Sequence, residues 1–113
     1  MRASLKNLWF DPEPSTLPDD PAEFSVLVRM TVGPAGGPGE ESFDITVCTP
    51  EWLARQALRG PYDARHHVVV SYESFDKNAL RDWLAKRVDA VQADRWHEVA
   101  QRVGRLGYWE FED

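Results

Sequence analysis

The residue types best suited to catalysis or metal binding in this sequence are one cysteine, Cys48, and three histidines. His66 and His67 are adjacent, so on a β-strand their side chains would point to opposite faces and could not hold one metal ion together. His97 stands apart from both, and no paired spacing typical of a zinc site occurs. The sequence therefore predicts neither a metal site nor a cofactor.

Cys48 immediately precedes Thr49 and Pro50, a pair typical of a helix start. Together with Leu53 it occupies the two positions of a hydrophobic staple, which favours a packing role over a nucleophilic one. A small enzyme that uses the Cys48 thiol or the histidines is kept as an alternative hypothesis.

Several carboxylates come in pairs that resemble an acid and a base: Asp19 with Asp20, Glu40 with Glu41, and Glu110 with Glu112. All of them lie in segments predicted to be loop or tail, whereas catalytic carboxylates usually need burial or a close like charge. No nucleophile elbow, phosphate-binding loop or dinucleotide fingerprint occurs either. We therefore expect a protein that is not an enzyme.

The charge balance points to a basic partner. The chain of 113 residues has 19 acidic residues against 13 lysines and arginines, a formal net charge of -6. This sign is wrong for a protein that wraps nucleic acid. No apolar run approaches the roughly 20 residues of a membrane span, and a lone cysteine is typical of a reducing compartment. We expect a cytoplasmic protein that contacts neither nucleic acid nor membrane directly.

Period-two alternation of apolar residues predicts strands at 24–32 and 43–48, and residues 4–10 form a first candidate strand before them. The glycine-rich stretch 33–41 would join the last two as a hairpin. A β-branched run at 66–72 predicts a further strand, buried on both faces around residues 68–70. The proline-rich segment that follows the first strand predicts a surface loop.

Helical spacing of apolar residues predicts three helices. The first starts at the cap Thr49 and ends at Gly60, and the other two start at the caps Asp76 and Asp94. The order of the elements predicts one α+β domain over residues 1–113, an antiparallel β-meander of about four strands with three helices packed on one face.

The last seven residues, GYWEFED, interleave three aromatic rings with three carboxylates. We expect a final strand or strap in which Trp109 and Phe111 seal the core while the acids stay in water. Direct contact of these rings with a partner is the alternative.

Three stretches in series resemble a known family: ESFDITVCTPEWLA at 41–54, HHVVVSYES at 66–74 and DRWHEVAQRVGRLGYWEFED at 94–113. Together they are similar to the immunity protein 8 family of bacterial polymorphic toxin systems, and the resemblance covers almost the whole chain. It implies a cytoplasmic antitoxin that binds one cognate toxin domain, commonly a nuclease or other enzyme, and neutralises it.

A basic cleft in such a toxin would be masked by an acidic surface of the antitoxin. The residues that we predict to bind the toxin are Glu40, Glu41, Asp44, Trp109, Glu110, Glu112 and Asp113. A non-catalytic domain that interacts with another partner or oligomerises through its aromatic surface is the other alternative. The sequence leaves the oligomeric state open.

Overall fold

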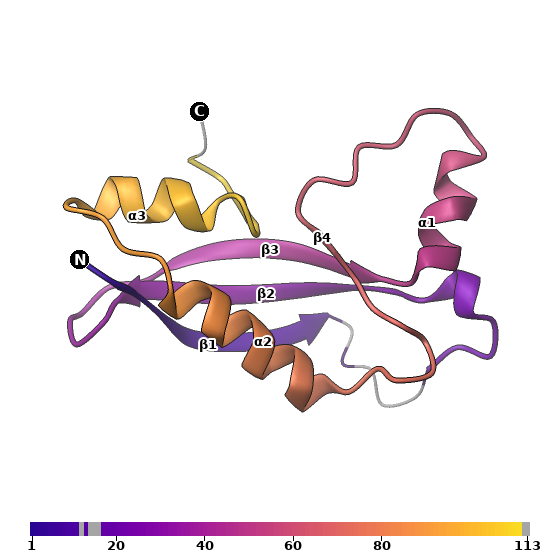
Figure 1. Ribbon diagram of the computed structural model, residues 1–113, viewed down its shortest axis with the longest axis horizontal. Helices are drawn as coiled ribbons and strands as arrows, with labels where there is room; N and C mark the ends of the chain where they lie inside the picture. The colour runs from indigo at the N-terminus through magenta and orange to yellow at the C-terminus, as the bar shows by residue number, and fades with distance from the viewer. Residues whose placement is uncertain (12, 14–16, 112–113) are drawn as a thin grey trace.

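Three antiparallel strands form the centre of the fold (Figure 1). They follow one another in the chain and in the sheet: β1 (Ala3–Asp11), β2 (Ser25–Pro34) and β3 (Glu41–Cys48). The predicted meander and the glycine-rich hairpin between β2 and β3 are confirmed. The computed structural model describes residues 1–11, 13 and 17–111.

Two shorter strands share the outer edge of β3. β5 (Tyr108–Trp109) pairs antiparallel with Phe43 and Asp44, near the start of β3. β4 (His67–Val69) pairs with the other end of β3 and runs parallel to it. The parallel direction requires a long crossover from β3 to β4, and helix α1 with the loop after it supplies this connection.

Three helices complete the α+β architecture that the sequence predicts: α1 (Pro50–Ala57), α2 (Lys77–Asp89) and α3 (Trp96–Val103). A short 3-10 helix, η1 (Pro21–Glu23), precedes β2. The Thr49 side chain caps α1 by accepting a hydrogen bond from the amide of Trp52, as expected for this helix start.

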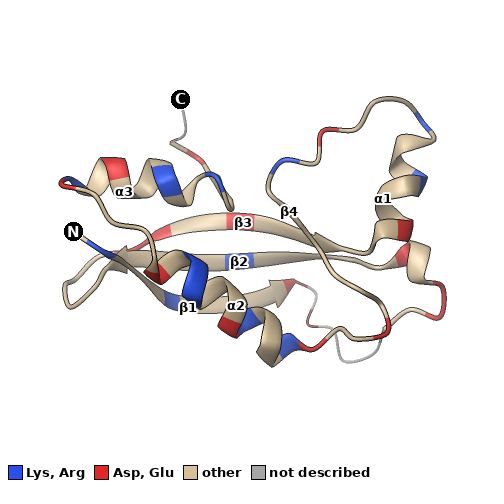
Figure 2. Ribbon diagram, viewed as in Figure 1, with Lys and Arg blue, Asp and Glu red and all other residues tan. Residues whose placement is uncertain are grey.

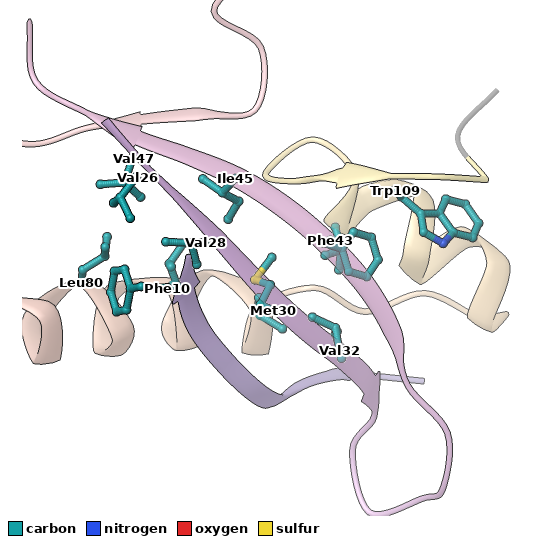
Figure 3. Packing of buried hydrophobic residues seen from close by; sticks show 14 of the residues in the cluster. Phe10, Val26, Val28, Met30, Val32, Phe43, Ile45, Val47, Leu80 and Trp109 are labelled. Carbon is teal, nitrogen blue, oxygen red and sulfur yellow. The ribbon is translucent and has the colours of Figure 1, made fainter. Parts of the chain in front are cut away.

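One face of the sheet carries the core (Figure 3). Alternate side chains of β2 and β3 point into it and are buried: Val26, Val28, Met30, Val32, Phe43, Ile45 and Val47. Helices α2 and α3 supply buried apolar residues to the same cluster, Leu84 and Val99 among them. Helix α1 has no fully buried residue and lies beyond the end of the sheet (Figure 1).

The opposite face of the sheet carries the residues of the other parity. We call it the open face and define it by Trp9, Asp11, Arg29, Asp44 and Tyr108. Of these, only Asp44 is partly buried and the others are exposed. The side chains of α2 and α3 that pack against the sheet do so on the core face. The open face is accessible around Trp9, Arg29 and Tyr108, whereas Thr31, which has the same parity on β2, is buried.

Two local predictions are wrong. The fourth strand has three residues instead of seven, and it is not buried on both faces, because Val69 is exposed while Val68 and Val70 pack against the core. An edge strand with a neighbour on one side only gains less burial than a central one. The start of α3 also differs.

Helix α3 begins at Trp96, and its N-cap is Arg95 instead of Asp94, with no side-chain cap. Tertiary contacts fix this start. The amide of Ala93 donates to the carbonyl of Met1 at 2.9 Å, and the Trp96 indole donates to the Glu41 carboxylate. Neither contact can be predicted from the local sequence pattern, because both partners are far away in the chain.

Candidate functional site

Two segments that the sequence analysis emphasises, the start of β3 and the segment of β5, lie side by side. The β3–β5 pairing places Phe43 beside Trp109 (Figure 3) and Asp44 beside Tyr108. Gly107 permits this close approach, because a Cβ at that position would lie 3.0 Å from Ile45 Cγ1 and 3.1 Å from Phe43 Cβ. Acidic residues near the hairpin and in the tail therefore belong to one region of the molecule.

Glu41 lies on the core side of this region and binds two tryptophans. Trp109 Nε1 donates to Glu41 Oε1 at 3.0 Å, and Trp96 Nε1 donates to Oε2 of the same carboxylate. We call these three residues the indole clamp. The Trp109 ring also stacks on Phe43, with centroids 6.3 Å apart. The clamp ties α3 and β5 to the first residue of β3, so Glu41 has a structural role.

The tail residues differ in burial. Trp109 is 4% exposed, so the prediction that it seals the core is confirmed, and its ring has little surface to offer a partner. Phe111 is 61% exposed, so its predicted sealing role is wrong. The strand ends at Trp109, and a turn then directs Phe111 outward. Glu110 is exposed, whereas Glu112 and Asp113 lie outside the described residues.

Four side chains form a row across the open face, one from each of β1, β2, β3 and β5. Trp9 pairs with Arg29, Arg29 with Asp44, and Asp44 with Tyr108. The rings at the two ends are large and accessible, with Trp9 44% and Tyr108 50% exposed. We call this set the aromatic row. The row therefore has one aromatic ring on each side of a charged pair, and the sheet holds all four residues in place.

The charged pair in the row is bidentate. Arg29 Nε donates to Asp44 Oδ1 at 2.8 Å, and Arg29 Nη2 donates to Oδ2 at 3.0 Å. Figure 2 shows the basic segment of β2 beside the acidic segment of β3. This hydrogen bonding and the charge of Asp44 raise the pKa of Arg29, and the charges of Asp11 and Glu110 add to the effect. Both oxygens of Asp44 are therefore engaged, while Asp11 and Glu110 add negative charge nearby.

Glu40 is exposed at the end of the hairpin tip, one residue before β3. Of the seven residues predicted to bind a toxin, Glu40, Asp44 and Glu110 thus lie at the surface or near it, and Glu41 and Trp109 belong to the indole clamp.

A second aromatic group lies at the α1 end of the sheet and contains Trp52, Tyr62 and His67. Their ring centroids are 5.3 to 6.0 Å apart, and the Tyr62 hydroxyl is 2.8 Å from His67 Nε2. Cys48 is fully buried, and this burial raises the pKa of its thiol to about 11. A buried neutral thiol is a poor nucleophile, which weighs against the enzyme alternative.

The other histidines make structural contacts. His66 Nε2 lies 2.8 Å from the carbonyl oxygen of Gly104, and the ring of His97 lies 5.6 Å from that of Trp109. Within the described ranges, no group of three or more His, Cys, Asp or Glu side chains is placed to hold a metal ion. The same part of the chain contains no helix of the length and apolarity that a membrane crossing requires.

A model of the immunity protein 8 family matches residues 4–113. The chain belongs to this family. No curated protein and no solved structure gives a significant match. The family resemblance seen in the three sequence stretches is thus confirmed over nearly the whole chain, and it identifies an immunity protein.

Sequence reasoning missed the aromatic row. The alternation in β2 already placed Arg29 opposite the buried valines, and Trp9 already lay in a predicted strand. What no local pattern contains is the register that aligns Trp9, Arg29 and Tyr108 across separate strands. A search of the predicted strands for aromatic residues that point away from the core would have found Trp9.

Proposed function

We propose that this immunity protein binds one cognate toxin domain in the cytoplasm and neutralises it without catalysis, by covering a basic cleft with an acidic surface. The observation that carries the proposal is the family match over residues 4–113. The net charge of -6 supports a basic partner.

Electrostatics favours such an arrangement for toxins that act on nucleic acids. These enzymes need basic clefts that hold phosphates, and carboxylates on a rigid scaffold can occupy or flank such a cleft. Opposite charges also raise association rates by roughly 10 to 10³. Fast capture matters because a newly made toxin must be inhibited before it acts.

Of the acidic residues predicted to bind the toxin, Glu40 and Glu110 are exposed and are the proposed contacts on which binding depends most. Asp44 is paired with Arg29, which neutralises much of its charge, so it contributes less. Glu41 and Trp109 contribute indirectly, because the indole clamp fixes the segment that precedes Glu110. Glu112 and Asp113 are kept as proposed contacts, although they lie outside the described residues.

Co-expression with each toxin encoded beside this gene tests the proposal. The protein should rescue cells from one of these toxins and bind that toxin when both are purified. Failure to bind or neutralise any of them would show that the function is different.

The charge contribution is tested by Glu110→Lys, with Glu73→Lys as the matched control at another exposed position. We expect Glu110→Lys to slow association with the toxin about 10-fold at low salt and to reduce the salt dependence of the rate. Glu73→Lys should slow it much less. Equal effects of the two substitutions would show that net charge alone acts, without a localised surface.

A further inference from the structure

We propose that the aromatic row of the open face is the surface that docks the toxin, and that its occupant is a flat basic patch of the toxin in which arginine or lysine side chains lie against Trp9 and Tyr108. This inference rests on the proposed function and names the surface that performs it.

The geometry of the row suits an interface core. Neighbouring strands lie about 4.8 Å apart, so the four strands separate the backbones at Trp9 and Tyr108 by roughly 14 Å across one face of the sheet. Trp9 and Tyr108 are 44% and 50% exposed although large rings are usually covered. Tryptophan, tyrosine and arginine are also the residue types enriched at binding hot spots, and all three occur in this row.

The charges around the row define the chemistry of the partner. Arg29 satisfies both oxygens of Asp44, so that pair contributes little net charge. Asp11 and Glu110 both attract Arg29, and neither forms an ion pair with another base among the residues that the structure describes. Asp11 and Glu110 therefore add two carboxylates near the row.

The Tyr108 end also has basic neighbours, because the His66 ring lies 5.9 Å from the Tyr108 ring and Arg65 lines the same hollow. Cations bind both the carboxylates and the exposed Trp9 ring, because arginine and lysine stack on aromatic rings as well as pairing with carboxylates.

Another exposed tryptophan, Trp83 of α2, offers a direct comparison with Trp9. It lines an apolar groove of 350 Å³ between α2 and β4 and is 42% exposed, close to the value for Trp9. The guanidinium of Arg87, however, lies 5.0 Å from the centroid of its ring. This ring already has a cation from its own chain, so it attracts a basic partner less than Trp9 does.

The equal exposure of Trp9 and Trp83 gives a matched pair of variants. The experiment measures calorimetric binding of the purified toxin domain that the protein neutralises to the wild type, Trp9→Ala, Tyr108→Ala and Trp83→Ala. We expect the toxin to bind at least about 30-fold more weakly to Trp9→Ala and to Tyr108→Ala, which is the loss typical of hot-spot residues. Trp83→Ala should change the affinity less than about 3-fold. Thermal unfolding of each variant confirms that it is folded.

The outcomes separate the two proposals. If the wild type binds no toxin, the proposed function fails. If the wild type binds and the affinities of Trp9→Ala and Tyr108→Ala equal that of the wild type, the function stands and the docking surface is wrong. A dimer that Trp9→Ala converts to a monomer with unchanged toxin affinity would also overturn the inference, because it would assign the row to a second copy of the chain.

Discussion

The Glu41→Ala variant should unfold at a lower denaturant concentration than the wild type. The substitution removes the carboxylate that accepts hydrogen bonds from the indoles of Trp96 and Trp109. A donor left without an acceptor in the interior costs about 1 to 3 kcal/mol. Trp109 is buried and Trp96 is partly buried, so water can compensate only the second of these donors.

We therefore expect a loss of about 2 kcal/mol at Trp109 and about 1 kcal/mol at Trp96, or about 3 kcal/mol in the free energy of unfolding. For a chain of 113 residues, each kcal/mol corresponds to a shift in Tm of about 4 °C, so the Tm should fall by about 12 °C. Glu41→Gln keeps one carbonyl oxygen that can accept one of the two bonds, and it should lose about half as much.

Urea unfolding monitored by circular dichroism measures these differences, and Glu40→Ala is the matched control. Glu40 is the neighbouring acid, is exposed, and should change the free energy of unfolding by less than about 0.5 kcal/mol. If Glu41→Ala were as stable as Glu40→Ala, the indole clamp would not stabilise the fold, and Glu41 would return to the set of proposed toxin contacts.

Two further predictions concern the hairpin and the buried thiol. A Cβ at Gly33 would lie 1.9 Å from the carbonyl oxygen of Gly39, so Gly33→Ala should cost about 1 to 3 kcal/mol in urea unfolding. Gly37→Ala, whose Cβ would lie 3.6 Å from Pro34 Cβ, should be close to neutral, and equal stabilities would contradict the clash. Burial raises the pKa of the Cys48 thiol from 9.0 to about 11, so the folded protein holds this proton more tightly than the unfolded chain does. This stabilisation is present below pH 9.0 and is lost as the pH rises towards about 11. The free energy of unfolding should then fall by about 1.4 kcal/mol per pH unit in that window, and Cys48→Ala, compared by urea titration, should remove this part of the fall. A fall of the same size in Cys48→Ala would show that other groups cause it.

The central strands, the cap at Thr49 and the α+β class could be predicted from the sequence because each depends on local periodicity or local hydrogen bonding. The parallel direction of β4 could not be predicted, because the sequence of the crossover through α1 does not indicate beside which strand the chain re-enters the sheet. The start of α3 was missed for a similar reason, because contacts with Met1 and Glu41 fix it.

At the candidate site, strand parity distinguishes Glu41 from Asp44. Phe43, Ile45 and Val47 point into the core, so Glu41 continues the inward series and Asp44 belongs to the outward one. That pattern predicts different surroundings for the two acids. It does not reveal the two indoles that Glu41 binds, because these lie 55 and 68 residues further along the chain.

The late position of β5 in the chain also affects the order of events during synthesis. The hairpin of β2 and β3 joins neighbouring segments and can form as soon as both have left the ribosome. The fourth side chain of the aromatic row comes from Tyr108, so a nascent chain that ends before it has the ion pair and one ring but lacks the second. The aromatic row is therefore completed only when the segment after α3 pairs with β3, a step that comes after the β2–β3 hairpin in chain order.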